Sequence, residues 1–350
     1  MGLEIREATM SDHSAVIDLI DKNGMHDYLP ALYPHLVSDP DNFPFVATLH
    51  GRVAGYMMAS VLDGGLTTLY RSARVGSSFR GMGIQKALLK HLKQFSSEQQ
   101  PSHMYDTLSS TDRHVENCSH LRAVGYRPVY TREGLQMVYQ IPTSPPERAG
   151  EDNSGRQIQV RELTRSDLQR MFQANSFCRE LFPQGRLFNW YVGYRLMEEN
   201  IRHLVRPWGG VFASFQDSRT STFSSSGTTI GISTSSSVTC ERDPGNSLDF
   251  YFPYNVAMVT FYNCHRSTYG AFYSLDTYAM PGLSRDHFQA HLRHNLKTLR
   301  RRFPGQRAAL ALTFDTTVSK ECVTSCLSEL GISELLPHQE KRQILYEKPA

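Results

Sequence analysis

The chain has 350 residues, of which 40% are hydrophobic and 20% charged, and its formal net charge is +3. This length suits two domains, and the composition is typical of packed globular proteins. The small net charge argues against a nucleic-acid partner, because nucleic-acid-binding proteins usually concentrate basic residues on one face. The sequence contains no run approaching the roughly 18 to 20 apolar residues of a membrane helix, so no membrane partner is expected.

The N-terminal residues and the cysteines indicate the compartment. Acidic residues occur among the first twelve residues, and no apolar segment typical of a signal peptide follows, so we expect a cytoplasmic protein. The six cysteines are scattered and lack the Cys and His spacing of a zinc site. We therefore expect reduced thiols and no metal.

The first half predicts a mixture of strands and helices. Apolar and alternating segments predict strands at residues 3–6, 45–49, 53–62, 67–75 and 103–108. Ser11 or Asp12 can cap a first helix that runs through Val16 to Ile20, and a longer amphipathic helix begins at Ile84. A short helix near 118–123 and a closing hairpin at residues 132–134 complete this half.

Two biased segments divide the chain. Residues 142–156 are rich in Pro, Gly, Ser and charge, which predicts a linker between domains. Residues 217–247 are mostly Ser and Thr, which predicts a long loop with little to bury. We therefore expect one domain at 1–141, a linker at 142–156, and a second domain at 157–350 that carries the loop at 217–247.

The second half opens as a near copy of the first. Residues 5–12 and 160–167 share five identities in eight positions at a constant offset. Further on, Ile84, Gln85, Leu88 and Leu92 correspond to Phe288, Gln289, Leu292 and Leu296. Two unrelated openings with the same capping residues would explain part of this, but the number of identities favours an internal duplication.

A glycine-containing loop separates the strand at 67–75 from the amphipathic helix. The loop is Arg80-Gly81-Met82-Gly83 and continues into Ile84 and Gln85. Unpaired N–H groups at a helix N-terminus bind anions, and glycines let the backbone approach a phosphate closely. The loop lacks the third glycine and the acidic residue of a dinucleotide site, and it lacks the Gly-Lys-Ser/Thr of a P-loop. Two glycines alone fit an ordinary strand-to-helix turn equally well.

The order of the elements around this loop resembles the GCN5-related N-acetyltransferase (GNAT) superfamily over residues 3 to about 140. Its acetyl-coenzyme A motif is Gln/Arg-x-x-Gly-x-Gly/Ala, and this sequence departs from the motif at Ser78. The resemblance implies an α/β fold of the α+β kind, with a mixed, mostly antiparallel sheet flanked by helices. It also implies acetyl-coenzyme A as co-substrate. The pyrophosphate would lie at Arg80, Gly81, Met82, Gly83, Ile84 and Gln85, and the pantetheine arm beside Ala73, Arg74 and Val75.

The segment Met25-His26-Asp27-Tyr28-Leu29-Pro30 resembles the vertebrate histidine N-acetyltransferase group. That resemblance makes Asp27 and Tyr28 candidate acceptor contacts, since an Asp there would suit a protonated amine. The alternative is that Tyr28-Leu29-Pro30 forms only a packed helix terminus before proline.

Acetyl transfer to an amine needs a base, an oxyanion donor and an acid for the leaving thiolate. The resembling group carries a Glu on the strand before the loop, where this sequence has Arg71. Asp106 is the best remaining acid, and Tyr126 or His114 could take the place of the Tyr that many members of the superfamily carry. We expect direct attack of the amine, because no Cys and His form a plausible nucleophilic pair.

The second half has Ser284 to His287 where the first has Arg80 to Gly83, so it lacks the glycines and carries an acidic residue. We therefore expect a degenerate GNAT-like domain that supports the first domain or covers its acceptor cleft. The leading hypothesis is N-acetylation of a small amine, with the α-amino group of histidine or another free amino acid as the expected acceptor. The alternatives are N-acetylation of a peptide or protein, and a non-catalytic acetyl-coenzyme-A-binding or scaffold protein. The oligomeric state stays open.

Overall fold

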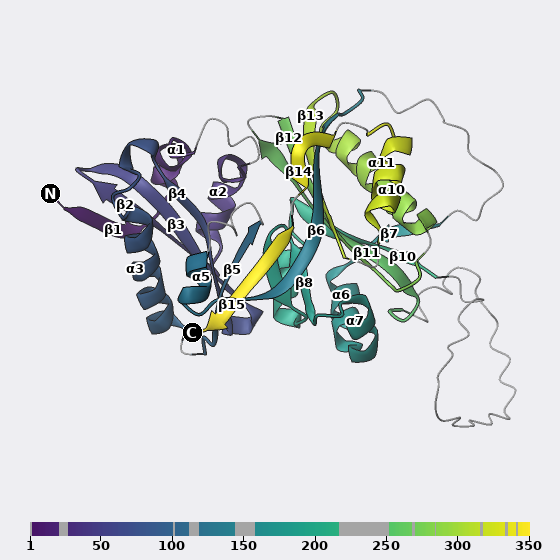
Figure 1. Ribbon diagram of the computed structural model, residues 1–350, viewed down its shortest axis with the longest axis horizontal. Coiled ribbons are helices and arrows are strands. Elements are labelled where there is room, and N and C mark those ends of the chain that lie inside the picture. The colour runs from purple at the N-terminus through teal and green to yellow at the C-terminus, as the bar shows by residue number, and fades with distance from the viewer. Residues whose placement is uncertain are drawn as a thin grey trace, which may run out of the picture.

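The computed structural model describes residues 2–20, 27–100, 102–111, 119–143, 158–216, 252–267, 270–283, 285–315, 318–332, 335–340 and 342–350. The predicted Ser/Thr-rich loop lies outside these ranges, as does nearly all of the predicted linker. The chain forms two lobes, each a sheet with helices on its faces (Figure 1). The two sheets join edge to edge into one 13-stranded sheet across the described ranges.

The first domain contains the predicted strands in the predicted order. They are β1 (Leu3–Glu7), β2 (Asn42–Leu49), β3 (Arg52–Leu62), β4 (Thr67–Val75) and β5 (Tyr105–Thr111). Strands β1 to β4 are antiparallel neighbours, whereas β5 runs parallel to β4. The helices are α1 (His13–Ile17), α2 (Leu29–Ser38), α3 (Ile84–Gln99) and α5 (Ser119–Ala123), and the short 3₁₀ turns are η1 (Met10–Asp12), η2 (Asp63–Gly65) and η3 (Ser77–Phe79).

The two faces of the first sheet carry different helices. Leu32 and Tyr33 of α2 pack with Tyr56 and Met58 on one face. Buried Ile84, Leu88 and Leu92 of α3, at helical spacing, pack with Met57 and Ala59 on the other. Because neighbouring residues of a strand point to opposite faces, the same alternation assigns each polar residue of β4 and β5 to a face.

The second domain is built from β7 (Val160–Glu162), β10 (Gly209–Phe215), β11 (Val256–Ser267), β12 (Gly270–Ala279), β13 (Arg307–Phe314) and β14 (Leu335–Glu340). A separate hairpin consists of β8 (Arg186–Asn189) and β9 (Val192–Arg195). The helices are α6 (Arg165–Gln173), α7 (Asn175–Leu181), α8 (Ile201–Leu204), α10 (Arg285–Arg302) and α11 (Lys320–Glu329), with a 3₁₀ turn η4 (Glu198–Asn200).

The duplication predicted from the sequence reappears in the contacts. Arg6 and Thr9 donate to the Asp12 carboxylate, and Thr9 forms a capping box with Asp12 at the start of the helical segment. Arg161 and Thr164 donate in the same way to Asp167, which opens α6. Matching residues of the two halves therefore form the same capping interactions at the start of their first helical segments. The second domain also repeats the parallel strand–helix–strand unit, as β12–α10–β13.

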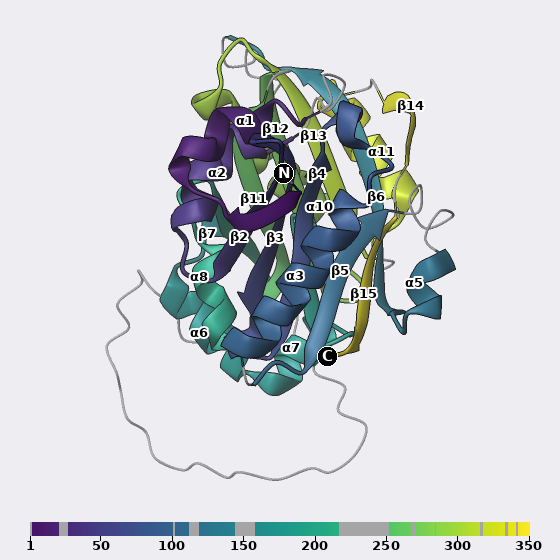
Figure 2. The ribbon, with the colours of Figure 1, turned by 90° about the vertical axis from the view of Figure 1, so that its left-hand side faces the viewer.

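The closing hairpin expected at residues 132–134 is wrong. β6 (Arg127–Gln140) continues straight through Gly134, pairing first with β15 (Gln343–Pro349) and then with β13. The strand next to β5 is supplied instead by β15 at the other end of the chain. Figure 1 shows β6 and β15 side by side between the lobes, and Figure 2 shows β15 beside β5. The two domains thus exchange strands, so the sheet of the first domain includes residues beyond the boundary proposed at 141.

A buried ionic network links β6 to the second domain at the point where the strands are exchanged. Arg132 is 1% exposed and donates to Asp315 (3.0 Å) and Asp276 (3.4 Å), while its guanidinium lies over the Tyr278 ring, 4.0 Å from the centroid. Burial raises the pKa of the Asp276 carboxyl, and the Arg132 charge opposes that rise. The network therefore depends on the cation.

Replacing Arg132 with Met is expected to lower the free energy of unfolding by about 3 to 5 kcal/mol, because it leaves two carboxylates without their buried cation. Urea unfolding measures the loss. Arg202→Met is the matched control, since Arg202 forms a surface pair with Asp41 and is 54% exposed. Equal losses in both variants would contradict a stabilising role for the network.

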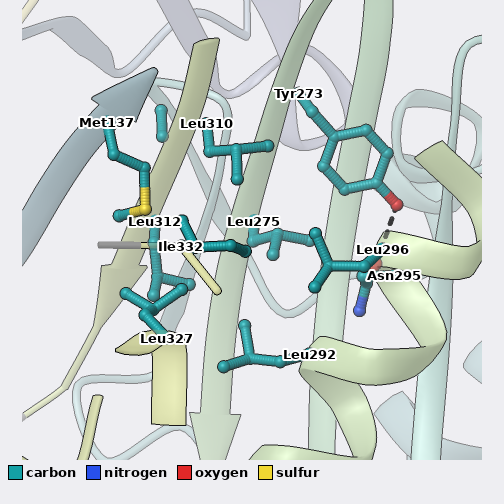
Figure 3. Close-up of a pocket in the computed structure, with 11 residues that line it drawn as sticks. Met137, Tyr273, Leu275, Leu292, Asn295, Leu296, Leu310, Leu312, Leu327 and Ile332 are labelled. Carbon is teal, nitrogen blue, oxygen red and sulfur yellow. Dashed lines mark hydrogen bonds between the residues drawn. The ribbon is translucent and has the colours of Figure 1, made fainter. Parts of the chain in front are cut away.

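The second domain has its own small cavity between its sheet and helices α10 and α11 (Figure 3). Its walls are apolar side chains from β6, β12, β13 and both helices, and its polar contact is the bond from Tyr273 Oη to Asn295 Oδ1 (2.9 Å). No charged side chain lines it among the described residues. The cavity is therefore a packing gap unsuited to a phosphate-bearing ligand.

Candidate active site

The first domain has a gap between two parallel strands that the second domain lacks. β4 and β5 pair only at Thr67–Tyr105, Thr68–Asp106 and Leu69–Thr107, after which they diverge. The equivalent strands β12 and β13 pair over seven positions, from Ala271–Ala308 to Thr277–Phe314. An extended arm of a ligand could lie between β4 and β5, whereas the ladder between β12 and β13 is closed.

A β-bulge bends β4 where the gap opens. Arg71 faces Met58 and Arg74 faces Tyr56, so Ser72 and Ala73 together oppose the single residue Met57. Ser72 has φ of 63°, in the left-handed region that non-glycine residues rarely adopt. The bulge takes backbone groups out of the regular ladder beside the gap, as is common next to active sites.

The glycine loop lies at the mouth of the gap, between η3 and α3. Gly81 and Gly83 have φ of 80° and 76°, and no atom lies within 4 Å of a Cβ built on either. Gly83 caps α3 without a side-chain hydrogen bond. The helix N-terminus thus starts at glycines that leave room beside the backbone, and unpaired N–H groups and the helix dipole at such an end favour an anion.

The two candidate acceptor residues contact β4 at the bulge. Asp27 forms an ion pair with Arg74 (2.7 Å) and accepts from the backbone N–H of Leu29 (3.0 Å), the first residue of α2. The Tyr28 hydroxyl is hydrogen-bonded to Ser72. Met25 and His26, the other residues of that segment, lie outside the described ranges.

The β8–β9 hairpin of the second domain reaches the same point. The Trp190 ring contacts the Tyr28 ring edge-on at 4.7 Å, and Ser109 of β5 donates to the Tyr191 carbonyl. Trp190 and Tyr191 form the two-residue turn, with φ of 51° and 64°. Positive φ at two bulky aromatic residues is strained, and such strain is concentrated at functional sites.

A cavity with both polar and apolar walls, one of them Trp190, lies between the domains on the α2 face. The first domain contributes Leu32, Leu36, Asn42, Ser60, Leu62 and Arg71 to its lining, and the second contributes Asn189, Trp190, Val192, Tyr194, His203, Arg206, Trp208 and Asn263. Both tryptophans of the chain are among these residues. The second domain thus covers the face of the first sheet that carries the candidate acceptor residues.

The catalytic candidates Asp106 and Tyr126 lie together on the opposite, α3 face. The third candidate, His114, lies outside the described ranges. Asp106 is 3% exposed, forms ion pairs with Lys93 (2.8 Å) and Lys348 (3.3 Å), and lies 3.1 Å from His103 Nε2. Burial, and then the nearby Asp106 charge, raise the pKa of the Tyr126 phenol, which therefore keeps its proton. Lys93 and Lys348 hold the Asp106 carboxylate from two sides, so its contacts favour a role in holding neighbouring groups. The structure thus separates these two residues from Asp27 and Tyr28.

Other groups at the site were not expected from the sequence. Trp190, Arg206 and Asn263 come from the second half, and Arg71 stood out only as a replacement for Glu. The scarcity of tryptophan was a usable signal, because both copies of the rarest residue line one cavity. Among the described residues, no group of three His, Cys, Asp or Glu side chains is placed to hold a metal ion.

Stability is expected to fall below pH 6.5 because of two buried histidines. Burial lowers the pKa of His203 and of His291 to about 3. Between pH 6.5 and 3 these two histidines are protonated in the unfolded chain and neutral in the folded chain, so a lower pH favours unfolding. At pH 5 the cost is about 2 kcal/mol for each histidine. Urea unfolding at pH 7.5 and 5 measures it. His291→Gln should reduce the difference in the free energy of unfolding between the two pH values by about 2 kcal/mol, the contribution of one histidine. An equal stability of the wild-type chain at both pH values would refute this cause.

The strand order, the gap and the glycine loop define the class of protein: an acyltransferase fold in which the two parallel strands diverge in the first copy and stay paired in the second. Residues 5–133 match the model of the acetyltransferase (GNAT) family. The first domain therefore matches this family over nearly its whole length. Among the described residues, no helix is long and apolar enough to cross a membrane.

Similar proteins extend the comparison to the second half. The human protein named probable N-acetyltransferase 16 is 25% identical over 203 residues, which cover 51% of this chain and 50% of that protein. The match thus spans about half the length of this curated relative. The tandem GNAT protein from the clavulanic acid biosynthesis pathway is similar over 99% of this chain and 98% of its own, at 14% identity and a TM-score of 0.54. A GCN5-related N-acetyltransferase from Sphaerobacter thermophilus is similar over 99% of this chain and 95% of its own, at 13% identity and a TM-score of 0.53. These likenesses show the fold of the whole chain, a GNAT domain followed by a GNAT-like domain.

Proposed function

We propose that the chain transfers the acetyl group of acetyl-coenzyme A to the amine of a small molecule. The main support is the combination of the open gap and glycine loop in the first domain with a cavity that the second domain encloses. A polypeptide acceptor needs an open groove, whereas a small amine fits a covered site. The α-amino group of histidine or another free amino acid is the favoured acceptor.

Residues of the first domain would hold the co-substrate. The N–H groups of residues 81–85 and the Arg80 guanidinium would bind the pyrophosphate at the start of α3. The backbone of Ala73, Arg74 and Val75 would border the pantetheine arm inside the gap. The Asp27–Arg74 ion pair supports this arrangement, because it holds the side chain of Arg74 toward α2 and off the strand edge.

The β4 bulge is the proposed source of the oxyanion donor. It lies where the gap opens, and backbone N–H groups aimed at a developing oxyanion are a large source of rate enhancement. Asp27 and Tyr28 are the proposed acceptor contacts, and they reach this bulge through Arg74 and Ser72. The attacking amine would therefore approach from the α2 face.

Proton transfer to the leaving thiolate is assigned to Tyr126 on the α3 face. Burial and the nearby Asp106 charge raise the pKa of this phenol, so it is protonated at neutral pH and can donate a hydrogen bond to the developing thiolate. Asp106 is proposed as the residue that positions this phenol, since Lys93 and Lys348 fix its carboxylate. The base that deprotonates the amine is not assigned to a residue.

Release of free thiol from acetyl-coenzyme A tests the proposal. Purified protein is assayed against the twenty amino acids, common polyamines and a set of short peptides, and the products are identified by mass. We expect turnover with one or a few free amines and none with peptides. Turnover with peptides alone would establish a peptide acetyltransferase. No turnover, with acetyl-coenzyme A still raising the melting temperature, would establish a binding-only protein.

A further inference from the structure

Arg71 points from β4 into the cavity between the domains. Its Nε donates to Ser60 Oγ (2.9 Å) and one terminal nitrogen lies 3.5 Å from Asn42 Oδ1. Arg71 lines the cavity together with both of these residues. Among the described residues the guanidinium has no carboxylate partner, and Nη1 has no hydrogen-bond acceptor. Arg71 therefore presents a positive charge and free donors to the cavity.

The rest of the lining leaves that charge uncompensated. Arg206, the other guanidinium there, is paired with Asp39 at 3.0 Å. His203 lies beside Arg206 and is buried, and burial together with the neighbouring arginines lowers its pKa to about 3, so it is neutral. No carboxylate lines the cavity in the part of the chain that the structure describes. A half-buried cation without a counter-charge is costly, and an anionic ligand would remove that cost.

The cavity is adjacent to the proposed acetyl site. Trp190 lines it and also contacts Tyr28, whose hydroxyl is bonded to Ser72 in the bulge. Ser72 follows Arg71 directly in β4. A small molecule with an amine at the bulge could therefore place an anionic group at Arg71. The planar fork of a guanidinium matches a carboxylate, which it can bind with two parallel hydrogen bonds.

We infer that Arg71 binds a carboxylate of the acceptor and so selects small amines that also carry a carboxylate. This inference rests on the proposed function, because it concerns the acceptor of the same reaction. It gives Arg71 a role opposite in charge to the Glu of the resembling group. The second domain takes part through Trp190, Asn263 and Arg206, which enclose the anion site.

The test compares each accepted amino acid with the same amine lacking its carboxylate, for example histidine with histamine. The wild-type enzyme should prefer the amino acid by about 100-fold in kcat/KM, the effect of one charged hydrogen-bonding pair. Arg71→Met should raise KM for the amino acid by a similar factor, with kcat, the KM for acetyl-coenzyme A and the KM for histamine changed less than about threefold. Arg71→Lys should recover part of the loss, and Arg202→Met, on the exterior of the same domain interface, should change none of these values.

A binding measurement separates this inference from the proposed function. Amino acids and histamine are titrated by calorimetry into each protein saturated with coenzyme A. Carboxylate-selective binding that disappears in Arg71→Met would uphold the anion site even if no amine were acetylated. Equal use and equal binding of histidine and histamine, or an unchanged amino-acid KM and affinity in folded Arg71→Met, would overturn the inference while turnover by the wild-type protein left the proposed function standing.

Discussion

Removal of residues 342–350 is expected to abolish acetyl-coenzyme A binding, although the match to the family model ends at residue 133. These residues contain β15, which pairs with β5 over seven positions and with β6 over five. Without β15, the edge of β5 that faces away from β4 has no partner. The buried Leu345 and the ion pairs of Glu347 with Arg186 and Arg195 are lost as well. We therefore expect the first domain to lose its folded sheet.

Calorimetric titration with acetyl-coenzyme A and circular dichroism of the truncated chain measure the effect. Binding should fall below detection and the cooperative thermal transition should be lost or broadened. A synthetic peptide of residues 342–350 should restore binding when it is added to the truncated chain, whereas a scrambled peptide should not. Wild-type affinity in the truncated chain would show that the exchanged strand is dispensable.

Gly83→Asp is expected to weaken acetyl-coenzyme A binding at least about 100-fold, since two like charges 4 Å apart repel by about 4 kcal/mol at an effective dielectric constant of 20. Gly83 has a positive φ in open space, and Asp is among the residues that tolerate this region best. The variant should therefore fold, and the new carboxylate would lie where the pyrophosphate is proposed to bind.

Gly282→Asp is the matched control. Gly282 has φ of 77°, also has open space around it, and lies three positions before α10, close to the place in the second copy that Gly83 has directly before α3. The two variants thus share the strain and the charge change, and they differ in which copy of the fold carries them. We expect Gly282→Asp to bind acetyl-coenzyme A like the wild-type chain. Equal losses in the two variants would point to a general electrostatic or folding effect.

Much of the first domain could be predicted because its signals are local. The strand–loop–helix unit around Gly81 and Gly83 is contiguous in sequence, and the apolar period of α3 is clear from Ile84 to Leu92. The duplication was equally visible, because Arg6, Thr9 and Asp12 lie within seven residues of one another and recur as a group. Local hydrogen bonds, which determine capping and turn residues, leave such local patterns.

The strand exchange could not be predicted in this way. The residues that pair β15 with β5 and β6 are more than 200 positions apart in sequence, and nothing in Arg132–Gly134 distinguishes a hairpin from a continuous strand. The strained turn at Trp190 and Tyr191 was equally hidden, because it lacks the glycine or asparagine that usually marks positive φ. The strand exchange and the turn at Trp190 depend on contacts between the two halves of the chain. The same contacts bring Arg71 and Trp190 into one cavity.

The faces of the sheet also required the structure. Asp106 is one of few acidic residues near the gap in sequence, but alternation along β5 places it on the α3 face with Lys93. The candidates at Asp27 and Tyr28 lie on the α2 face, where the second domain covers them. Sequence reasoning named residues of both groups and could not tell that the sheet separates them.

Native mass spectrometry of the chain with acetyl-coenzyme A tests most directly the claim that one of two duplicated domains is the working site. The account predicts one bound acetyl-coenzyme A per chain, absent in Gly83→Asp and retained in Gly282→Asp. Two bound molecules, or one that persists in Gly83→Asp, would contradict the assignment of the open gap and glycine loop of the first domain as the cofactor site.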